Sequence, residues 1–328
     1  MKKVTQFYRT PLPGQFSIEQ VFIPLKSIIS QQFDLKEYFC DLNRSRFQQT
    51  RDASRQQGDV NHITGDVHFL ALGLPSKNTI LTIHDLFHYQ YNLGYIKKKV
   101  YKFFWVDKPI KRVKIITTIS NYTKEKIIEL TGCPPEKIRV IHNSTSDDLV
   151  FSPKQFNTER PTILQIGDAP HKNAIRLIEA VRGLSCKIVF IRGTLDYKLT
   201  DKLRKYKIDY KWFSYLKREE VKNEYQKCDL LFFASEMEGF GVPIIEANQT
   251  GRPVITSKVT SMPEIAGEAA FYVDPFSVDE IRNALVTLIN SENLRNRLIE
   301  NGRLNCERFS ATYIAHEYCS LYSDIINS

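Results

Sequence analysis

The chain has 328 residues, of which 42% are hydrophobic and 25% are charged, and its formal net charge is +9. This length and composition predict a globular protein of about two domains and argue against a disordered or fibrous chain. Six scattered cysteines without a C-x-x-C pair, and the lack of a long apolar run, argue against a disulfide framework, a zinc ribbon, a signal peptide and a transmembrane helix, and favour a cytoplasmic protein.

Apolar runs predict strands in the first half of the chain at residues 3–8, 37–42, 60–64, 79–83 and 115–119. Helical spacing predicts helices at residues 17–30, 94–105 and 122–130. The glutamine-rich residues 44–58 predict a loop, and the polar residues 145–157 predict a linker. We therefore expect a first domain at residues 1–150 and a second at 151–328.

The second half of the chain alternates more regularly between the two kinds of element. Strands are predicted at residues 161–167, 187–191, 229–234, 253–256 and 269–273, and helices at 173–181, 219–227, 244–250 and 278–289. This alternation predicts the α/β class, with two doubly wound, Rossmann-like domains that face a central cleft. Ligands of such domains bind beyond the carboxyl ends of the strands.

The most informative stretch is Glu238-Gly-Phe-Gly-Val-Pro-Ile-Ile-Glu246, which follows a predicted strand and opens a predicted helix. Gly239 and Gly241 allow backbone to approach a ligand closely, and Pro243 suits the first helical turn. Two carboxylates and a helix N-terminus can therefore bind a polyhydroxyl group and an anion together. The same carboxylates would fit the acid and base of a glycoside hydrolase, a reaction that needs no phosphate-binding loop.

A second candidate loop, Gly167-Asp-Ala-Pro-His171-Lys172-Asn173, joins a predicted strand to a predicted helix. Lys172 adds a full positive charge to the partial charge of the helix N-terminus, which favours a diphosphate. The spacing matches neither the Walker A motif nor the dinucleotide fingerprint. By itself the loop is therefore more typical of an ordinary strand–helix connection.

His84 and Asp85 end a predicted strand of the first domain. From this position His84 can donate a hydrogen bond to a sugar hydroxyl, although a lone histidine is more often structural. His84 and His88 also have the spacing of a helical metal-ligand pair, but no third ligand accompanies them. We therefore predict no metal site.

The positive charge is concentrated in the first half of the chain. Residues 1–150 hold 22 Lys and Arg against 14 Asp and Glu, and the remaining residues hold 24 against 23. The densest segment, residues 95–114, mixes Lys and Arg with Tyr, Phe and Trp. This mixture fits an anionic membrane surface, nucleic acid, or a solvated helix with one face packed inward. No recognition motif accompanies it, so we predict no nucleic-acid partner.

Taken together, these segments resemble the retaining glycosyltransferases of family 4, the group 1 glycosyltransferases, which have the GT-B fold. The resemblance is strongest over residues 229–251, where Glu238 and Glu246 match the family's Glu-x7-Glu motif. It also covers residues 119–127, 137–143 and 261–267, the loop from Gly167 to Asn173, and His84-Asp85. The chain departs from the family at His171, where Arg is common, and at Pro13-Gly14, where Gly-Gly is usual.

The resemblance implies an acceptor-side first domain and a nucleotide-sugar-binding second domain, with the last helix packing back on the first. It implies that Glu238 contacts hydroxyls of the donor sugar, that Glu246 binds the ribose and that Lys172 holds the diphosphate. His84 would line the reaction centre. The other implied donor contacts are Gly14, Gly167, His171, Asn173, Phe240, Gly241 and Val242.

The resemblance also implies a reaction. A hexose-type sugar would pass, with retention and without a metal or other cofactor, from a nucleoside-diphosphate sugar to a saccharide or lipid-linked saccharide acceptor in surface polysaccharide or glycoconjugate synthesis. The basic segment would hold the protein on the inner face of an anionic membrane as a peripheral protein. The alternative is a non-catalytic nucleotide-sugar-binding protein on the same scaffold, against which the presence of Glu238, Lys172 and His84 argues.

Overall fold

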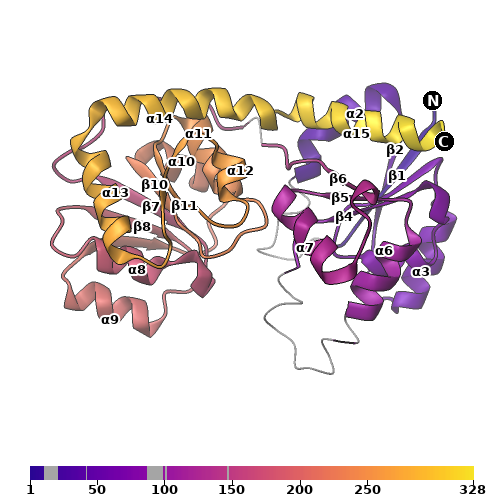
Figure 1. Ribbon diagram of the computed structural model, residues 1–328, viewed down its shortest axis with the longest axis horizontal. Coiled ribbons are helices and arrows are strands. Elements are labelled where there is room, and N and C mark those ends of the chain that lie inside the picture. Colours follow the sequence, from indigo (N-terminus) through magenta and orange to yellow (C-terminus); the bar gives the residue numbers. More distant parts are fainter. Residues whose placement is uncertain (11–20, 42, 87–98, 100–101, 146–147) are drawn as a thin grey trace. The chain divides into compact units, whose positions relative to one another are not determined.

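The computed structural model divides into two compact units, which we describe separately (Figure 1). Unit 1 comprises Met1–Ser146 and Phe309–Ser328, and unit 2 comprises Asp147–Arg308. The structure describes residues 1–10, 21–41, 43–86, 99, 102–145 and 148–328. The C-terminal helix α15 (Ala311–Ile326) therefore belongs to the N-terminal unit.

Unit 1 is built on a parallel sheet with the strand order β2-β1-β3-β4-β5-β6. The strands are β1 (Lys3–Tyr8), β2 (Asp34–Phe39), β3 (Val60–Ile63), β4 (Thr79–Ile83), β5 (Ile115–Thr118) and β6 (Ile138–Val140). β3 and β4 are buried along their whole length, as expected for strands covered on both faces. The order reverses between β1 and β3, so the topological switch point lies at their carboxyl ends.

Helices cover both faces of this sheet. One face packs against α2 (Lys26–Gln32), the 3-10 turn η1 (Ile23–Leu25) and α15. The other packs against α3 (Arg46–Arg55), η2 (His68–Leu72), the π-helix η4 (Lys102–Asp107), α6 (Lys108–Arg112) and α7 (Asn121–Thr131). The short 3-10 turns η3 (Ser76–Asn78) and η5 (Pro135–Lys137) precede β4 and β6.

A buried polar chain fixes α15 on the sheet of unit 1. The hydroxyl of Tyr322 accepts a hydrogen bond from Gln6 Nε2 (3.0 Å) and lies 2.7 Å from His62 Nδ1. The other ring nitrogen of His62 lies 2.7 Å from the hydroxyl of Thr82. Burial lowers the pKa of His62 to about 3, so the imidazole is neutral at physiological pH.

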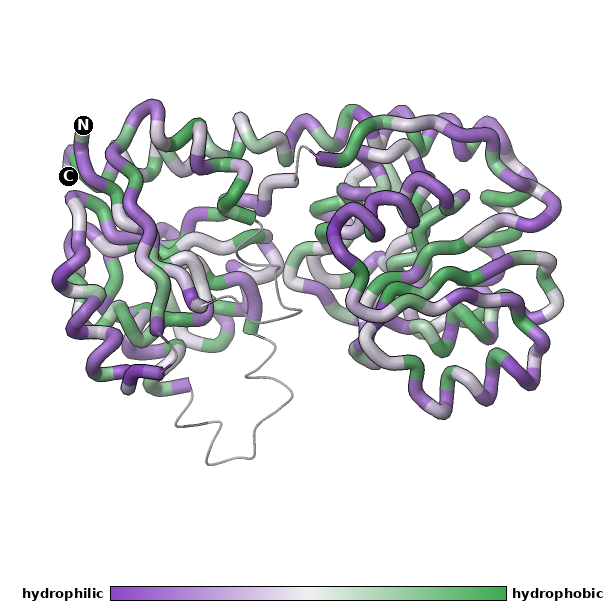
Figure 2. The backbone as a smooth tube through the Cα atoms, turned by 180° about the vertical axis from the view of Figure 1, so that it is seen from behind, coloured by the Kyte–Doolittle hydropathy of each residue, from purple (hydrophilic) through white to green (hydrophobic). Residues whose placement is uncertain are grey.

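Unit 2 is built on a parallel sheet with the strand order β12-β11-β10-β7-β8-β9. The strands are β7 (Thr162–Ile166), β8 (Lys187–Ile191), β9 (Asp209–Phe213), β10 (Leu230–Phe233), β11 (Val254–Ser257) and β12 (Ala270–Val273). This is the doubly wound order of Rossmann folds, and its switch point lies between β7 and β10. Hydrophobic residues run along the central strands, whereas hydrophobic and hydrophilic residues alternate along the outer helices (Figure 2).

Two layers of helices cover the sheet of unit 2. One face packs against α8 (Ala174–Ala180), α9 (Tyr197–Lys205) and α13 (Val278–Asn290). The other packs against α10 (Arg218–Lys227), α11 (Val242–Thr250) and α12 (Met262–Ala266). The helix α14 (Glu292–Asn305) packs on α11, the turn η6 (Pro170–Lys172) precedes α8, and η7 (Cys306–Phe309) leads into α15.

Several predicted elements of unit 1 need correction. The loop expected at residues 44–58 contains α3, because Ser45 and Gln48 form a capping box that starts a helix in a polar sequence. The strand expected at residues 37–42 begins at Asp34. Most of the helix expected at residues 94–105 falls outside the described residues, as do residues 17–20 of another.

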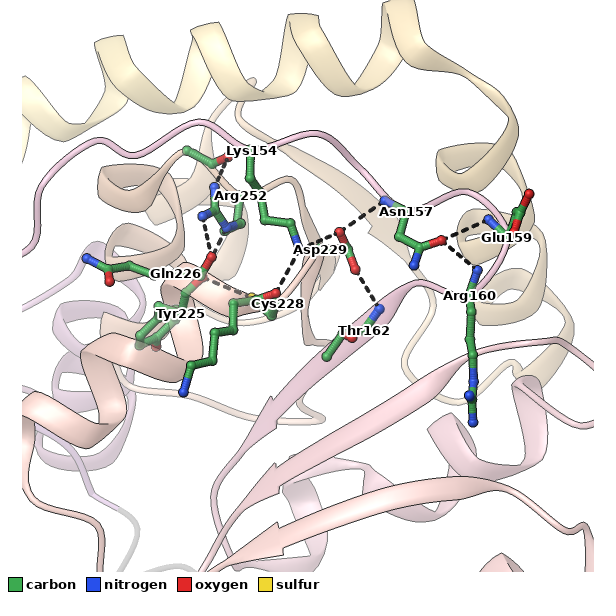
Figure 3. Close-up of polar contacts among 12 residues, drawn as sticks. Lys154, Asn157, Glu159, Arg160, Thr162, Tyr225, Gln226, Cys228, Asp229 and Arg252 are labelled. Atoms are coloured by element: carbon green, nitrogen blue, oxygen red, sulfur yellow. Dashed lines mark hydrogen bonds and ion pairs between the residues drawn. The ribbon is translucent and has the colours of Figure 1, made fainter.

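A buried cluster of charged residues supports the amino end of β10 (Figure 3). The carboxylate of Asp229 accepts hydrogen bonds from the backbone N–H groups of Asn157 (3.1 Å) and Thr162 (2.8 Å) and pairs with Lys154 (2.8 Å). Arg252, which is only 2% exposed, donates to four backbone carbonyls, those of Tyr225, Gln226, Thr250 and Gly251. The cluster therefore fixes β10 and the end of α11 from the side opposite to the switch point.

Candidate functional site

Two loops of unit 2 meet beyond the carboxyl ends of the neighbouring strands β7 and β10. The loop after β7 runs from Gly167 to Asn173, and the loop after β10 runs from Ser235 to Gly241. The backbone N–H of Glu236 donates to the carbonyl of His171 (2.8 Å), which joins the two loops. They occupy the switch point, where sheets of this order bind their ligands.

Lys172 and Glu238 face each other across this junction, with Nζ 2.5 Å from Oε1. The two side chains are only 20% and 11% exposed. The Nζ atom also lies 4.9 Å from the centre of the Phe233 ring, which adds a cation–π contact. The junction therefore holds a fixed ammonium beside a fixed carboxylate, groups suited to a phosphate and to a hydroxyl.

Gly167 provides the path by which Lys172 reaches this position. Its φ of +112° favours glycine. A Cβ atom at Gly167 would lie 2.9 Å from both Cγ and Cε of Lys172. The aliphatic stem of the lysine therefore lies across space that only a glycine leaves open.

Asn173 holds the first loop in place. It has a left-handed conformation at the start of α8, with φ of 63°, and is 2% exposed. Its Nδ2 donates to the carbonyls of Ala234 (3.0 Å) and Pro275 (2.6 Å), and its Oδ1 accepts from Arg176 (2.9 Å). Since these contacts engage both ends of the amide, the side chain of Asn173 supports the loop from within.

The loop after β10 is fixed by two hydroxyls. Ser261 donates to the carbonyls of Glu238 (3.0 Å) and Phe240 (2.9 Å), and the hydroxyl of Thr260 accepts from the N–H of Glu238 (3.2 Å). Gly241, with φ of +112°, then begins α11, and a proline occupies its first turn. The first turn of α11 therefore begins four residues after Glu238, and the N-terminus of a helix stabilises an anion.

Glu246 lies farther along α11, with its side chain 12% exposed and hydrogen-bonded to Arg218 Nη1. The guanidinium of Arg218 also binds Asp148 with two hydrogen bonds, from Nε (2.9 Å) and Nη2 (2.8 Å). Burial lowers the pKa of Arg218, but the hydrogen bonds to Asp148 and the charge of Glu246 outweigh it, so the pKa is raised overall. Burial, together with the charge of Glu246, raises the pKa of Tyr225 well above its usual value.

His84 lies at the carboxyl end of β4 in unit 1 and is half-buried. Its Nε2 lies 2.7 Å from the carbonyl oxygen of Thr64, and because a carbonyl only accepts, Nε2 carries the proton. Burial lowers the pKa of His84, so the neutral imidazole presents Nδ1 as an acceptor. The expectation that His84 donates to a sugar hydroxyl is therefore corrected: Nδ1 can accept from a hydroxyl.

The structure brings most, though not all, of the predicted site residues of unit 2 together. Gly167, His171, Lys172 and Asn173 lie in one loop, Glu238, Phe240 and Gly241 lie in the other, and Val242 is the first residue of α11. Gly14 lies outside the described residues. Sequence reasoning missed Arg218 and Asp148, because a polar helix start and a polar linker carry no local sign that they meet Glu246.

A short ion pair at the switch point of unit 1 was also missed. Arg9 follows β1 and Asp66 follows β3, and Nη1 of Arg9 lies 2.6 Å from Oδ2 of Asp66. Asp66 has a left-handed φ of 55°, and the preceding Gly65 has φ of 138°. Both charged groups act on the pKa of His84, Asp66 raising it and Arg9 lowering it.

Two family models together match most of the chain. Residues 147–305 match the model described as glycosyl transferases group 1, and residues 30–149 match the model of glycosyltransferase family 4. The chain belongs to the group 1 glycosyltransferases of family 4. The family expected from the motifs is thereby confirmed.

Curated relatives point in the same direction. The chain is 30% identical over 206 residues to the O-antigen chain mannosyltransferase RfbU of Salmonella typhimurium, covering 61% of this chain and 57% of the relative. It is 24% identical over 263 residues to O-antigen chain mannosyltransferase B of Escherichia coli, covering 71% and 67%. The chain thus spans between about half and two thirds of the length of these relatives.

Solved structures confirm the expected GT-B fold class. Anabaena HepE in complex with UDP and glucose has a TM-score of 0.78 at 16% identity, covering 99% of this chain and all of that chain. WaaG, a glycosyltransferase involved in lipopolysaccharide biosynthesis, has a TM-score of 0.72 at 14% identity, covering 98% and 99%. Among the described residues no helix is long and apolar enough to cross a membrane, and no cluster of three His, Cys, Asp or Glu side chains could hold a metal ion.

Proposed function

We propose that this chain is a glycosyltransferase that moves a hexose-type sugar from a nucleoside-diphosphate sugar to a saccharide or lipid-linked saccharide in surface polysaccharide synthesis. The observation that carries the proposal is the 2.5 Å pair of Lys172 and Glu238 at the switch point. In a nucleotide sugar the anomeric carbon is bonded directly to a phosphate oxygen, so phosphate and sugar hydroxyls are adjacent. An ammonium beside a carboxylate matches that adjacency.

The residues around this pair supply the proposed chemistry. Lys172 and the N-terminal amides of α11 stabilise the negative charge that develops on the departing diphosphate. Glu238 accepts hydrogen bonds from the sugar, whose anomeric carbon becomes positive as the bond breaks. Glu246 accepts from the ribose hydroxyls of the nucleotide.

We further propose that transfer retains the anomeric configuration and needs no metal, because Lys172 and helix amides supply positive charge to the diphosphate. The O-antigen mannosyltransferases among the relatives make mannose the first sugar to test. The purified protein is incubated with GDP-mannose, UDP-glucose and UDP-galactose, with and without EDTA, and a mannoside acceptor. Proton NMR of the product then gives its anomeric configuration.

An α-linked product formed equally well in EDTA supports the proposal in full. A β-linked product from an α-linked donor refutes retention, and loss of turnover in EDTA that Mg²⁺ restores refutes metal independence. Tight nucleotide-sugar binding without turnover on any acceptor supports the alternative of a non-catalytic binding protein.

We also propose that the basic segment at residues 95–114 brings the protein to an anionic membrane. Within its described part, Phe103 and Phe104 are 47% and 42% exposed, and Lys108 lies 4.7 Å from the Phe103 ring centre. Exposed aromatic rings beside lysines suit a headgroup layer. Flotation with phosphatidylglycerol vesicles should fall in Phe103→Ala/Phe104→Ala and in high salt, and flotation that neither change affects contradicts this part of the proposal.

A further inference from the structure

Arg218 joins Glu246 to Asp148 in a continuous charged chain. Three guanidinium N–H groups are used: those of Nε and Nη2 bind the two oxygens of Asp148 at 2.9 and 2.8 Å, and one on Nη1 binds Oε1 of Glu246. A planar guanidinium held at two points on one side cannot swing freely. Its contact therefore fixes the position of the Glu246 carboxylate.

The carboxylate of Glu246 keeps acceptor capacity for a ligand. Oε1 accepts from Arg218 and the buried Tyr225 hydroxyl is a further neighbour, but the two oxygens of a carboxylate together offer about four lone pairs. Asp148 pairs with Arg218 and, at 3.9 Å, with Lys222, so two cations lie beside the two carboxylates. The Glu246 carboxylate is thus held in a fixed orientation, and its side chain is 12% exposed.

We propose that Arg218 is a positioning residue that selects ribonucleotides. It holds Glu246 so that the carboxylate accepts from the neighbouring 2′- and 3′-hydroxyls of a ribose, which a 2′-deoxyribose cannot both supply. This inference rests on the proposed function, because it needs a nucleoside diphosphate bound with its ribose at Glu246. The selectivity then depends on Arg218, although Arg218 itself need not touch the ligand.

The chain offers a matched control for the loss of an arginine ion pair. Arg160 pairs with Asp209 at 2.8 Å in the same unit, but the two side chains are 58% and 42% exposed and lie apart from Glu246 in the sequence and in the sheet. Arg160→Met removes the same kind of charge without touching Glu246. It reports what a surface ion pair alone contributes.

The experiment measures Kd by calorimetry for UDP, GDP and ADP and for the 2′-deoxy form of whichever binds most tightly. The proteins are the wild type, Arg218→Met, Arg218→Lys, Asp148→Asn and Arg160→Met, each checked by a thermal melt. We expect the wild type and Arg160→Met to prefer the ribonucleotide by about tenfold or more, since an ionised acceptor loses a strong hydrogen bond. In Arg218→Met the preference should fall to within about twofold, and Arg218→Lys and Asp148→Asn should lie between.

Three results would overturn the inference. A full preference in Arg218→Met or Arg218→Lys, whatever the loss of affinity, shows that Arg218 does not position Glu246. Tight binding by the wild type without a preference for ribose shows that the ribose does not bind at Glu246. The proposed donor site is then retained, and only the inference fails. If the wild type binds none of the three diphosphates, the proposed function fails and the inference fails with it.

Discussion

Gly167→Ala tests how Lys172 is placed at the switch point. The backbone φ of +112° is costly for alanine, by about 1–3 kcal/mol. In addition, the new Cβ would lie 2.9 Å from Cγ and Cε of Lys172. The lysine must then leave its path to Glu238, and its charge is withdrawn from the departing diphosphate.

The two effects predict different losses in stability and in turnover. The free energy of unfolding should fall by about 1–3 kcal/mol, from the backbone strain. The rate constant kcat should fall by about 10- to 100-fold, since complete removal of one such charge-stabilising group costs about 100- to 1,000-fold. Urea denaturation gives the first quantity, and steady-state release of the nucleoside diphosphate gives the second.

Gly183→Ala is the matched control. Gly183 also has a positive φ, of 73°, but a Cβ atom there would meet nothing within 4 Å. Its substitution should lower stability by about 1–2 kcal/mol and leave kcat unchanged. If Gly167→Ala behaves in the same way, losing stability with full turnover, the placement of Lys172 over Gly167 is irrelevant to the reaction and the reasoning is refuted.

Three further predictions concern the supports of the two units. Arg252→Met removes the guanidinium donor from four backbone carbonyls, of which that of Gln226 is partly exposed and that of Tyr225 keeps Cys228 Sγ as a donor. Urea unfolding should show a loss of about 2–4 kcal/mol with an unchanged Kd for nucleotide, and a loss below about 0.5 kcal/mol contradicts the assigned role. Asn173→Ala should lose about 2 kcal/mol and weaken nucleotide binding, because it frees the loop from Ala234 and Pro275; unchanged binding by calorimetry would count against this. The folded pKa of His62, about 3, lies below its unfolded value, so only the unfolded state gains the proton as pH falls. Stability is therefore complete above about pH 6.5 and declines below it, by about 2 kcal/mol between pH 7 and pH 5. The decline should shrink in His62→Gln, and an equal decline there would show that other groups cause it.

The central strands of both sheets were predictable because they are short apolar runs between polar turns. β7, β10 and β11 lie within one or two residues of their predicted bounds. The helix α3 was not predictable by this route, because its sequence is polar and its start depends on the capping box of Ser45 and Gln48. Such a helix depends on residue helix propensity and on local side-chain hydrogen bonds, and hydrophobic periodicity reports neither.

The candidate site was predictable only where a single loop carries its chemistry. Glu238 and Lys172 were each found from glycine-rich turns after strands, but they are 66 residues apart in the chain. Their contact depends on β7 and β10 being neighbours, which the doubly wound order provides. Arg218 and Glu246 are 28 residues apart, and the arginine stands in a charged helix start that is typical of a solvated surface.

The central claim is that the Lys172–Glu238 pair acts on a nucleotide sugar. The most direct test is kcat for donor turnover in Lys172→Met and Glu238→Gln, beside Arg160→Met, with thermal melts to establish folding. We predict that the two site variants fold and lose turnover by about 100-fold or more, while Arg160→Met stays within about twofold of the wild type. Turnover in both site variants close to that of Arg160→Met would contradict the account.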